Sequence, residues 1–185
     1  MPLTQIDSKP ALIVIDLQKG VIAMAPTVAG EVVGKSAQLA SAFRERGWPV
    51  VLVNVVARNS ARTDGGFPNF NPPPDWTDLA PELGPQPSDI LVSKKSFGAF
   101  INTGLDATLR GLGVTQIFLC GIATSIGVES TARSAYDYGY NVVFASDAMA
   151  DRRPEAHQYC IENTFPRLGE IDSTANLLAA IGKTA

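Results

Sequence analysis

The sequence predicts an α/β fold with a mostly parallel sheet and helices on both faces. Short runs of large aliphatic residues alternate along the chain with longer segments whose apolar residues recur at helical spacing. This alternation is typical of β-α-β units, whose strands are buried on both faces and therefore appear as continuous apolar runs. With 185 residues, 45% of them apolar, the chain has the length and the apolar content of one domain, which we expect to span residues 1–185.

The first half of the chain contributes three predicted strands and one predicted helix. An unbroken aliphatic run over residues 11–15 ends at Asp16 and predicts the first strand. The segment 30–46 places its apolar residues on one helical face and is followed by a glycine, a residue favoured just after a helix end. Two further strands are predicted at 49–56 and 90–93.

The second half of the chain alternates more regularly. The helix predicted over 128–138 is amphipathic, and the one predicted over 154–165 begins with proline, which is favoured in the first turn. Two more helices are predicted at 105–112 and 174–181. Strands are predicted at 116–120 and 141–145, with a weaker one at 170–172.

The segment 57–89 interrupts this alternation, because it is rich in proline and contains several aromatic residues. A long loop inside a compact domain is usually functional, for example as a lid over a site. The aromatic residues favour a lid, and a passive surface excursion is the alternative that the sequence leaves open.

Composition excludes several classes of function. A net charge of −3 and the lack of a basic stripe argue against binding to nucleic acid. No apolar run approaches the roughly 18 residues of a membrane span, and no secretory signal pattern is visible at the start of the chain. Two cysteines do not make a disulfide framework, and a single histidine excludes a multi-histidine zinc site. We therefore expect a cytoplasmic protein that acts on a small molecule without a metal or other cofactor.

Three candidate positions lie where predicted strands end, the edge at which open parallel sheets bind ligands. Asp16 follows an aliphatic strand, where burial raises the pKa of a carboxylate and suits it to proton transfer, although a helix cap or a surface acid is the commoner role for such a residue. Lys94 and Lys95 follow the third strand and are a weak signal by themselves. The turn 121–127 precedes a helix, and its backbone amides are placed to bind an anion or an oxyanion.

Together these positions resemble the isochorismatase-like hydrolase superfamily, also called the cysteine hydrolases. The resemblance runs from about residue 10 to residue 181 and implies a three-layer Rossmann-like fold. Its six-stranded parallel sheet would have the order 3-2-1-4-5-6, with helices on both faces, and the protein would form a homodimer or a larger homo-oligomer. The motifs that carry the resemblance are LIVIDLQ (12–18), KKSFGAF (94–100), GIAT (121–124), GVESTARSA (127–135) and DAMA (147–150).

Most relatives in this superfamily use an Asp–Lys–Cys triad. By resemblance, Asp16 and Lys94 match the aspartate and the lysine, but Gly127 stands where the nucleophilic cysteine is expected. Because glycine has no side chain that can attack a carbonyl, the covalent thioester route is unavailable to this chain. Cys120 and Cys160 are expected to be buried, unreactive thiols rather than substitutes for that nucleophile.

The branch without the cysteine, the isochorismatases proper, carries glycine at this position and hydrolyses a vinyl ether. In that scheme Asp16 is the general acid that protonates the enol-ether carbon, and Lys94 orients it and holds a substrate carboxylate. The family's oxyanion site would consist of the backbone amides of Ala123 and Gly127, next to a cis peptide expected between Ile122 and Ala123. The predicted function is therefore hydrolysis of a small carboxylated metabolite, with isochorismate as one candidate.

Two alternatives remain open at this stage. The GVESTAR stretch resembles the amidase branch, and Gly98 replaces a serine that relatives usually carry, so a hydrolase of another substrate is one alternative. A non-catalytic protein that binds a small molecule or takes part in an assembly is the other.

The remaining predictions concern side chains near the site and on the helices. Predicted substrate contacts, besides Ile122 and Ala123, are Gln18, Arg58 and Phe100, and Lys95 and Arg62 are further cationic candidates. His157 is rejected as a general base because its helix is expected to be peripheral. Structural roles are predicted for Asp147, as a cap at the end of the fifth strand, and for Glu129 with Arg133, as a helical ion pair.

Overall fold

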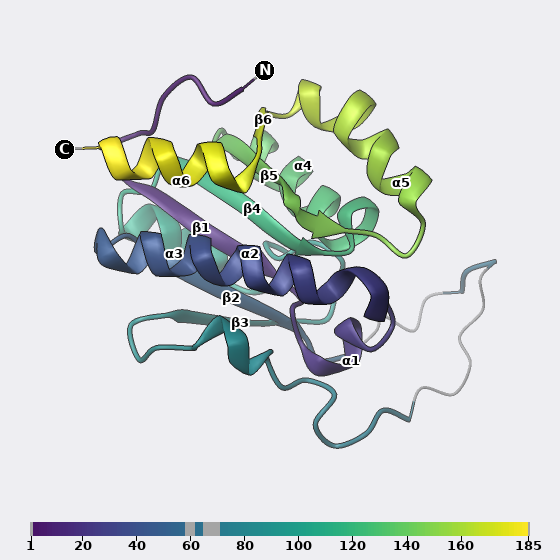
Figure 1. Cartoon of the computed structure of the whole chain (residues 1–185). Coiled ribbons are helices and arrows are strands. Elements are labelled where there is room, and N and C mark those ends of the chain that lie inside the picture. The colour runs from purple at the N-terminus through teal and green to yellow at the C-terminus, as the bar shows by residue number, and fades with distance from the viewer. Residues whose placement is uncertain (1, 58–61, 65–70, 185) are drawn as a thin grey trace.

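The computed structural model describes residues 2–57, 62–64 and 71–184. Its six strands form a single parallel sheet of order β3-β2-β1-β4-β5-β6, which confirms the predicted strand order (Figure 1). The strands are β1 (Pro10–Ile15), β2 (Val50–Val55), β3 (Ile90–Lys94), β4 (Gln116–Ile122), β5 (Asn141–Ala150) and β6 (Glu170–Asp172).

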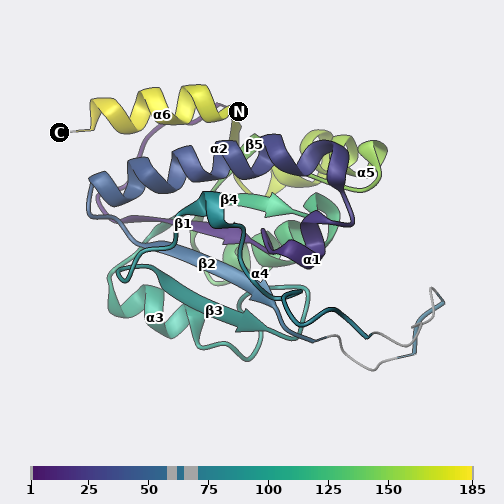
Figure 2. The same ribbon diagram turned by 60° about the horizontal axis from the view of Figure 1, so that its bottom comes forward.

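Helices cover both faces of this sheet. In Figure 2, α2 and α6 lie on one side of the strands and α3 on the other. The α-helices are α1 (Lys19–Ile22), α2 (Pro26–Glu45), α3 (Leu105–Gly111), α4 (Glu129–Asp137), α5 (Pro154–Tyr159) and α6 (Thr174–Lys183). Shorter helical turns are the 3₁₀ turns Pro81–Leu83 and Phe165–Arg167 and the π-helical turns Thr124–Val128 and Cys160–Thr164. Among the described residues, no helix is both long enough and apolar enough to cross a membrane.

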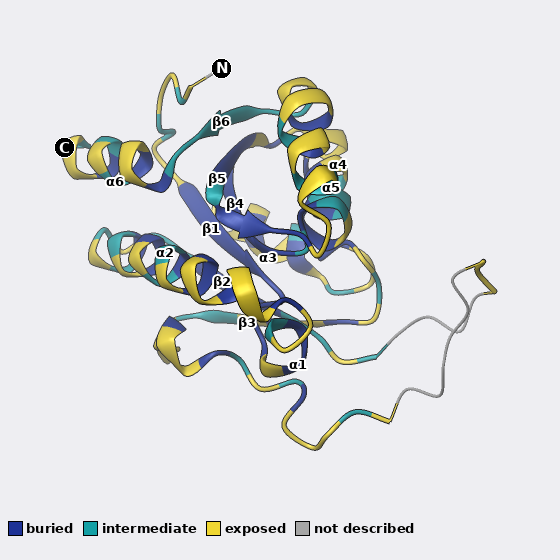
Figure 3. Cartoon of the chain, turned by 45° about the vertical axis from the view of Figure 1, so that its right-hand side comes forward, coloured by how far each residue is buried: buried dark blue, intermediate teal, exposed yellow. Residues whose placement is uncertain are grey.

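The strands are buried on both faces, which is why they appear as unbroken apolar runs in the sequence. Along β1, Leu12 and Val14 pack into the core on the α2 and α6 side, whereas Ala11, Ile13 and Ile15 pack into the core on the α3 and α4 side. Figure 3 shows β1 as fully buried, while the outer surfaces of the helices are exposed. The ends of the central strands are therefore fixed from both sides.

The largest departure from the predicted elements is the length of β5. This strand was predicted to end at residue 145 but continues to Ala150, because the pairing with β4 resumes after an irregularity in register. Beyond that irregularity Gly121 pairs with Met149, and Ile122 pairs with Ala150. Asp147 therefore lies within the strand, and the carboxyl end of β5 is level with that of β4.

The predicted helices also differ in their bounds. Helix α2 begins at Pro26 rather than at residue 30, and proline is favourable in a first helical turn. The helix predicted over 128–138 is preceded by a π-helical turn, Thr124–Val128, and the helix predicted over 154–165 continues after α5 as a π-helical turn, Cys160–Thr164. The short helix α1 follows β1 without having been predicted.

The later part of the long segment 57–89, which is described from residue 71 onward, packs against α1. The Trp76 side chain is buried, and a Cβ atom at Gly20 would lie only 1.9 Å from Trp76 Cδ1, so the ring fits there because residue 20 is a glycine. The backbone amide of Gly20 donates to Trp76 O at 3.0 Å, and that of Lys19 donates to Asp78 O at 2.8 Å. Residues 76–78 are thus held to α1, whereas residues 58–61 and 65–70 of the segment predicted as a lid lie outside the described residues.

Candidate functional site

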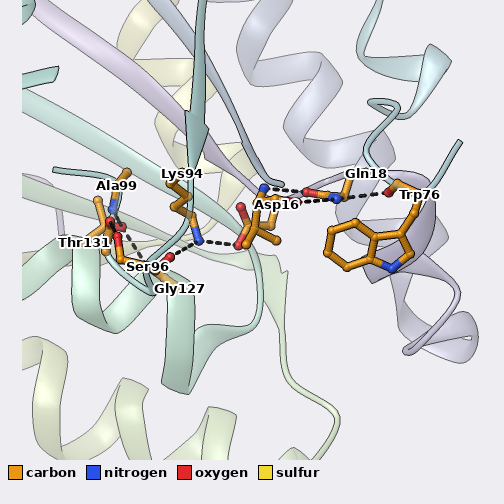
Figure 4. A network of polar contacts seen from close by, with 10 residues as sticks. Asp16, Gln18, Trp76, Lys94, Ser96, Ala99, Gly127 and Thr131 are labelled. Carbon is orange, nitrogen blue, oxygen red and sulfur yellow. Dashed lines mark hydrogen bonds and ion pairs between the residues drawn. The ribbon is translucent and has the colours of Figure 1, made fainter. Parts of the chain in front are cut away.

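An ion pair between Asp16 and Lys94 lies at the carboxyl edge of the sheet. Lys94 Nζ donates to Asp16 Oδ2 at 2.7 Å and to the backbone oxygen of Ser96 at 3.1 Å (Figure 4). Asp16 follows β1 and Lys94 is the last residue of β3, so the lysine side chain reaches past the end of β2. Both side chains are buried, with 8% and 2% of their surface exposed, respectively.

The surroundings of Asp16 favour its protonated form. Burial raises its pKa from 3.8 to about 6, and the neighbouring Lys94 ammonium opposes that rise. Lys94 holds Oδ2, whereas the buried Oδ1 has no hydrogen-bond partner among the described residues. One carboxyl oxygen is therefore oriented by the protein and the other remains available, an arrangement suited to moving a proton.

Gly127 forms the third side of this site. A Cβ atom built on it would lie 3.2 Å from Asp16 Oδ2 and 3.8 Å from Lys94 Nζ, so the side-chain position of residue 127 points at the ion pair. The same atom would lie 2.8 Å from Ile15 Cγ2, closer than real Cβ contacts. Asp16, Lys94 and Gly127 thus converge, and the isoleucine before Asp16 occupies part of the space that a larger residue 127 would need.

The turn that carries Gly127 is fixed by hydrogen bonds on two sides. Ala123 O accepts the backbone amides of Ile126 at 3.1 Å and Val128 at 3.2 Å, and the expected cis peptide between Ile122 and Ala123 is present. Thr131 Oγ1 donates to Gly127 O at 2.7 Å and accepts the Ala99 amide at 3.0 Å. These contacts tie the turn to the segment that follows Lys94.

Two of the predicted substrate contacts, Gln18 and Phe100, are engaged with other parts of the chain, and a third, Arg58, lies outside the described residues. Gln18 Oε1 accepts the Val55 amide at 2.7 Å, and its Nε2 donates to Val55 O and Trp76 O at 3.1 and 3.0 Å, so its carboxamide is bound to the backbone. Phe100 is buried, with its ring centroid 5.5 Å from that of Tyr138.

Both cysteines are buried thiols with raised pKa values. Cys120 is fully buried in β4, and burial raises the pKa of its thiol to about 12. Cys160 Sγ donates to Glu129 Oε2 at 3.2 Å, and burial together with this carboxylate raises its pKa to about 12 as well. Thiols with such pKa values are protonated at neutral pH and react poorly. Glu129 also pairs with Arg133 at 2.7 Å, as predicted.

Sequence reasoning missed the residues that follow the true end of β5. Asp151 Oδ2 accepts the backbone amide and the hydroxyl of Ser125 at 2.9 and 2.7 Å. His157 Nδ1 lies 2.9 Å from Thr124 Oγ1, so α5 packs beside the glycine-rich turn and is not peripheral as expected. Asp16 was found because it directly follows a predicted strand. Asp151 would have been found in the same way if β5 had been predicted to reach Ala150 rather than residue 145.

Asp147 has the structural role that was predicted for it, at a different place in the fold. Its Oδ1 accepts the amide and hydroxyl of Thr174 at 2.7 and 2.8 Å, and Lys35 Nζ lies 3.1 Å from its Oδ2. These hydrogen bonds at the start of α6, together with Lys35, lower the pKa of the Asp147 carboxyl despite partial burial. Among the described residues, no group of three or more His, Cys, Asp or Glu side chains is placed to hold a metal ion.

Comparison with known proteins identifies the family. The family model for the isochorismatase domain matches residues 10–176. The chain belongs to the isochorismatase family. An isochorismatase family protein from Burkholderia thailandensis has a solved structure that superimposes with a TM-score of 0.91 at 41% identity, over 97% of this chain and 98% of that one. The isochorismatase family protein YwoC of Bacillus subtilis, described as uncharacterized, is 40% identical over 182 residues, or 94% of each chain.

Relatives with a named activity are more distant. The ureidoacrylate amidohydrolase RutB of Stutzerimonas stutzeri is 39% identical over 111 residues, which are 58% of this chain and 45% of RutB. The relatives of the present chain thus include amidohydrolases.

Proposed function

We propose that this isochorismatase-family hydrolase acts on a small carboxylated metabolite without a thiol nucleophile, by hydrolysis of a vinyl ether such as isochorismate. The observation that carries the proposal is the position of Gly127, whose missing side chain faces Asp16 and Lys94. A nucleophile at this position would need a Cβ atom, and Ile15 Cγ2 would lie 2.8 Å from it. In this proposal the Asp16 carboxyl, rather than a side chain at residue 127, is the group that reacts with the substrate.

The proposed reaction begins with proton transfer from Asp16 to the terminal carbon of the vinyl ether. The new C–H bond leaves an oxocarbenium ion, water adds to it, and the proton that this water loses returns to Asp16. The hemiketal then collapses: its hydroxyl loses a proton and becomes the carbonyl of pyruvate, the bond to the former ether oxygen breaks, and that oxygen takes up a proton and leaves as an alcohol. General acid catalysis of this kind contributes about 10²–10⁴-fold to the rate, and positioning of the substrate supplies the rest.

The environment of each group supports its proposed role. A pKa of about 6 lets Asp16 hold a proton in a useful fraction of molecules near neutral pH and accept one back afterwards. Lys94 holds Oδ2 at 2.7 Å and would stabilise the carboxylate that forms on proton transfer. Oδ1, which has no hydrogen-bond partner among the described residues, would then be the oxygen that gives its proton to the substrate. The amides of Ala123 and Gly127 would bind a substrate oxygen or carboxylate.

The test is release of pyruvate from isochorismate, followed by coupling to lactate dehydrogenase. Activity should survive alkylation of thiols and should fall about 10²-fold or more in Asp16→Asn, which removes the proton donor. In the control Asp137→Asn, an exposed aspartate of α4, activity should be unchanged. The rate should also decline as pH rises above about 6, since the acid form of Asp16 is then depleted. Loss of activity on alkylation would refute the thiol-free mechanism.

A second candidate function is hydrolysis of an amide or ureido substrate, favoured by the similarity to RutB. It would require water, rather than a thiol, as the nucleophile at this site. Release of ammonia from ureidoacrylate or simple amides, without release of pyruvate from isochorismate, would place this reaction first. If neither reaction occurs, a role in binding rather than catalysis becomes the better explanation.

A further inference from the structure

A pocket lies beside the glycine-rich turn, outside the Asp16–Lys94 pair. It encloses about 380 Å³, a volume suited to a small organic molecule. Its lining residues come from the turns after β4 and β5 and from the start of α5. They are Ser125, Ile126, Asp151, Arg152, Arg153 and Ala156.

The fold brings these two turns together because β4 and β5 end at the same level. Ile122 pairs with Ala150, so the chain leaves both strands side by side at the carboxyl edge of the sheet. Asp151 then binds Ser125 through two hydrogen bonds, of 2.9 and 2.7 Å, and accepts the Arg153 amide at 3.2 Å. The two turns that form the pocket wall are therefore joined by the Asp151 side chain.

The charge of the pocket is unbalanced. Arg152 and Arg153 are exposed, and neither guanidinium has an ion pair or a hydrogen bond to any described residue. By contrast, the guanidinium groups of Arg44, Arg110 and Arg133 each pair with a carboxylate.

One negative charge opposes the two arginines within this lining. It belongs to Asp151, which already accepts the three hydrogen bonds described above. Two cationic groups in a pocket with one occupied carboxylate favour an anionic ligand.

We propose that this pocket binds a carboxylate of the substrate through Arg152 and Arg153, an inference that rests on the proposed reaction of a carboxylated metabolite. Lys94 is buried and already bonds Asp16 and Ser96, so it is poorly placed to neutralise a second carboxylate. Ser125 and Gly127 are two residues apart, a span of at most about 7 Å even if fully extended. In the proposed binding mode, a small molecule with its carboxylate in the pocket reaches across this turn, so that its other end meets Asp16.

Arginine suits this role because its planar guanidinium binds a carboxylate through two parallel hydrogen bonds. The pocket would thus select substrates by charge, while Asp16 acts on the distal bond. It would prefer carboxylates over neutral amides of the same shape.

The experiment compares the binding of benzoate and benzamide, which have the same shape and differ in charge, by NMR titration. Wild-type protein should bind benzoate more tightly than benzamide, with shifts at the amides of Ser125 and Ile126. The double variant Arg152→Gln/Arg153→Gln should lose about tenfold or more of the benzoate affinity, the size expected for charged hydrogen bonds. The control Arg167→Gln removes one arginine charge from an exposed 3₁₀ turn outside the pocket lining and should bind benzoate as the wild type does.

Because this titration needs no turnover, it separates the pocket from the reaction. Arginine-dependent binding of benzoate without any release of pyruvate would support the pocket and refute the vinyl-ether reaction. Equal affinity for benzoate and benzamide, no detectable binding of benzoate, or the same loss in Arg167→Gln would overturn the pocket. Hydrolysis of isochorismate with an unchanged KM in the double variant would also overturn it.

Discussion

Substitution of Gly127 by alanine should destabilise the protein, although alanine usually stabilises where glycine is replaced. The added Cβ would lie 2.8 Å from Ile15 Cγ2 and 3.2 Å from Asp16 Oδ2, so β1 or the turn must move. Overpacking of this kind costs about 1–3 kcal/mol, and the lower entropy of the unfolded alanine chain offsets about 0.4–1 kcal/mol of that. The midpoints of these ranges leave a net loss of about 1.3 kcal/mol. With about 2–4 °C per kcal/mol for a chain of this size, the melting temperature should fall by roughly 3–5 °C.

The matched control is Gly34→Ala, in the middle of α2. A Cβ atom there would meet nothing within 4 Å, so the helix should gain about 0.5–1 kcal/mol and the melting temperature should rise. Thermal and urea unfolding followed by circular dichroism would measure both variants. A Gly127→Ala variant as stable as the wild type would refute the reasoning, as would a fully additive double-mutant cycle between Gly127→Ala and Ile15→Ala.

Three further predictions rest on other parts of the structure. Because burial raises the pKa of Asp16 from 3.8 to about 6, the contribution of Asp16 to stability should be fully present below about pH 4 and should fall by about 3 kcal/mol as pH rises through about 6. Asp147 and Asp172, whose pKa values are lowered, contribute in the opposite direction, so urea titrations should find this fall as the difference between the wild type and Asp16→Asn. Gly20→Ala should displace the Trp76 ring, since the new Cβ would lie 1.9 Å from it, and should red-shift tryptophan fluorescence at a cost of about 1–3 kcal/mol. Light scattering should find a dimer or a larger assembly, with the half-exposed Tyr136 and Tyr138 at the contact, and a monomer at micromolar concentration would contradict this.

The sequence was sufficient for the sheet and for the centre of the site because both depend on local patterns. Apolar runs mark the buried strands, and Asp16, Lys94 and Gly127 lie at or just after strand ends that meet at one edge of a parallel sheet. The order of the strands came from the resemblance, since neither spacing nor periodicity specifies which strands are neighbours.

The errors arose where a polar residue has a partner far away in the chain. Ser146 and Asp147 look like the end of a strand, but they are accommodated within β5 because Ser146 donates to Asp172 O at 3.1 Å and Asp147 caps α6. Gln18 lies next to a candidate catalytic residue, yet its carboxamide is satisfied by backbone groups of Val55 and Trp76. No local pattern reveals such contacts, so the segment after β5 was overlooked and the backbone partners of Gln18 were not foreseen.

The backbone conformation of Asp16 limits which residues this position accepts. Its φ of 53° lies in the left-handed region, which glycine adopts freely and which asparagine and aspartate tolerate better than other residues. A screen of all substitutions at position 16 should therefore return folded protein mainly for glycine, asparagine and aspartate. Of these three, aspartate alone carries a proton that it can donate, so the shape of the chain and the proposed chemistry select the same residue for independent reasons.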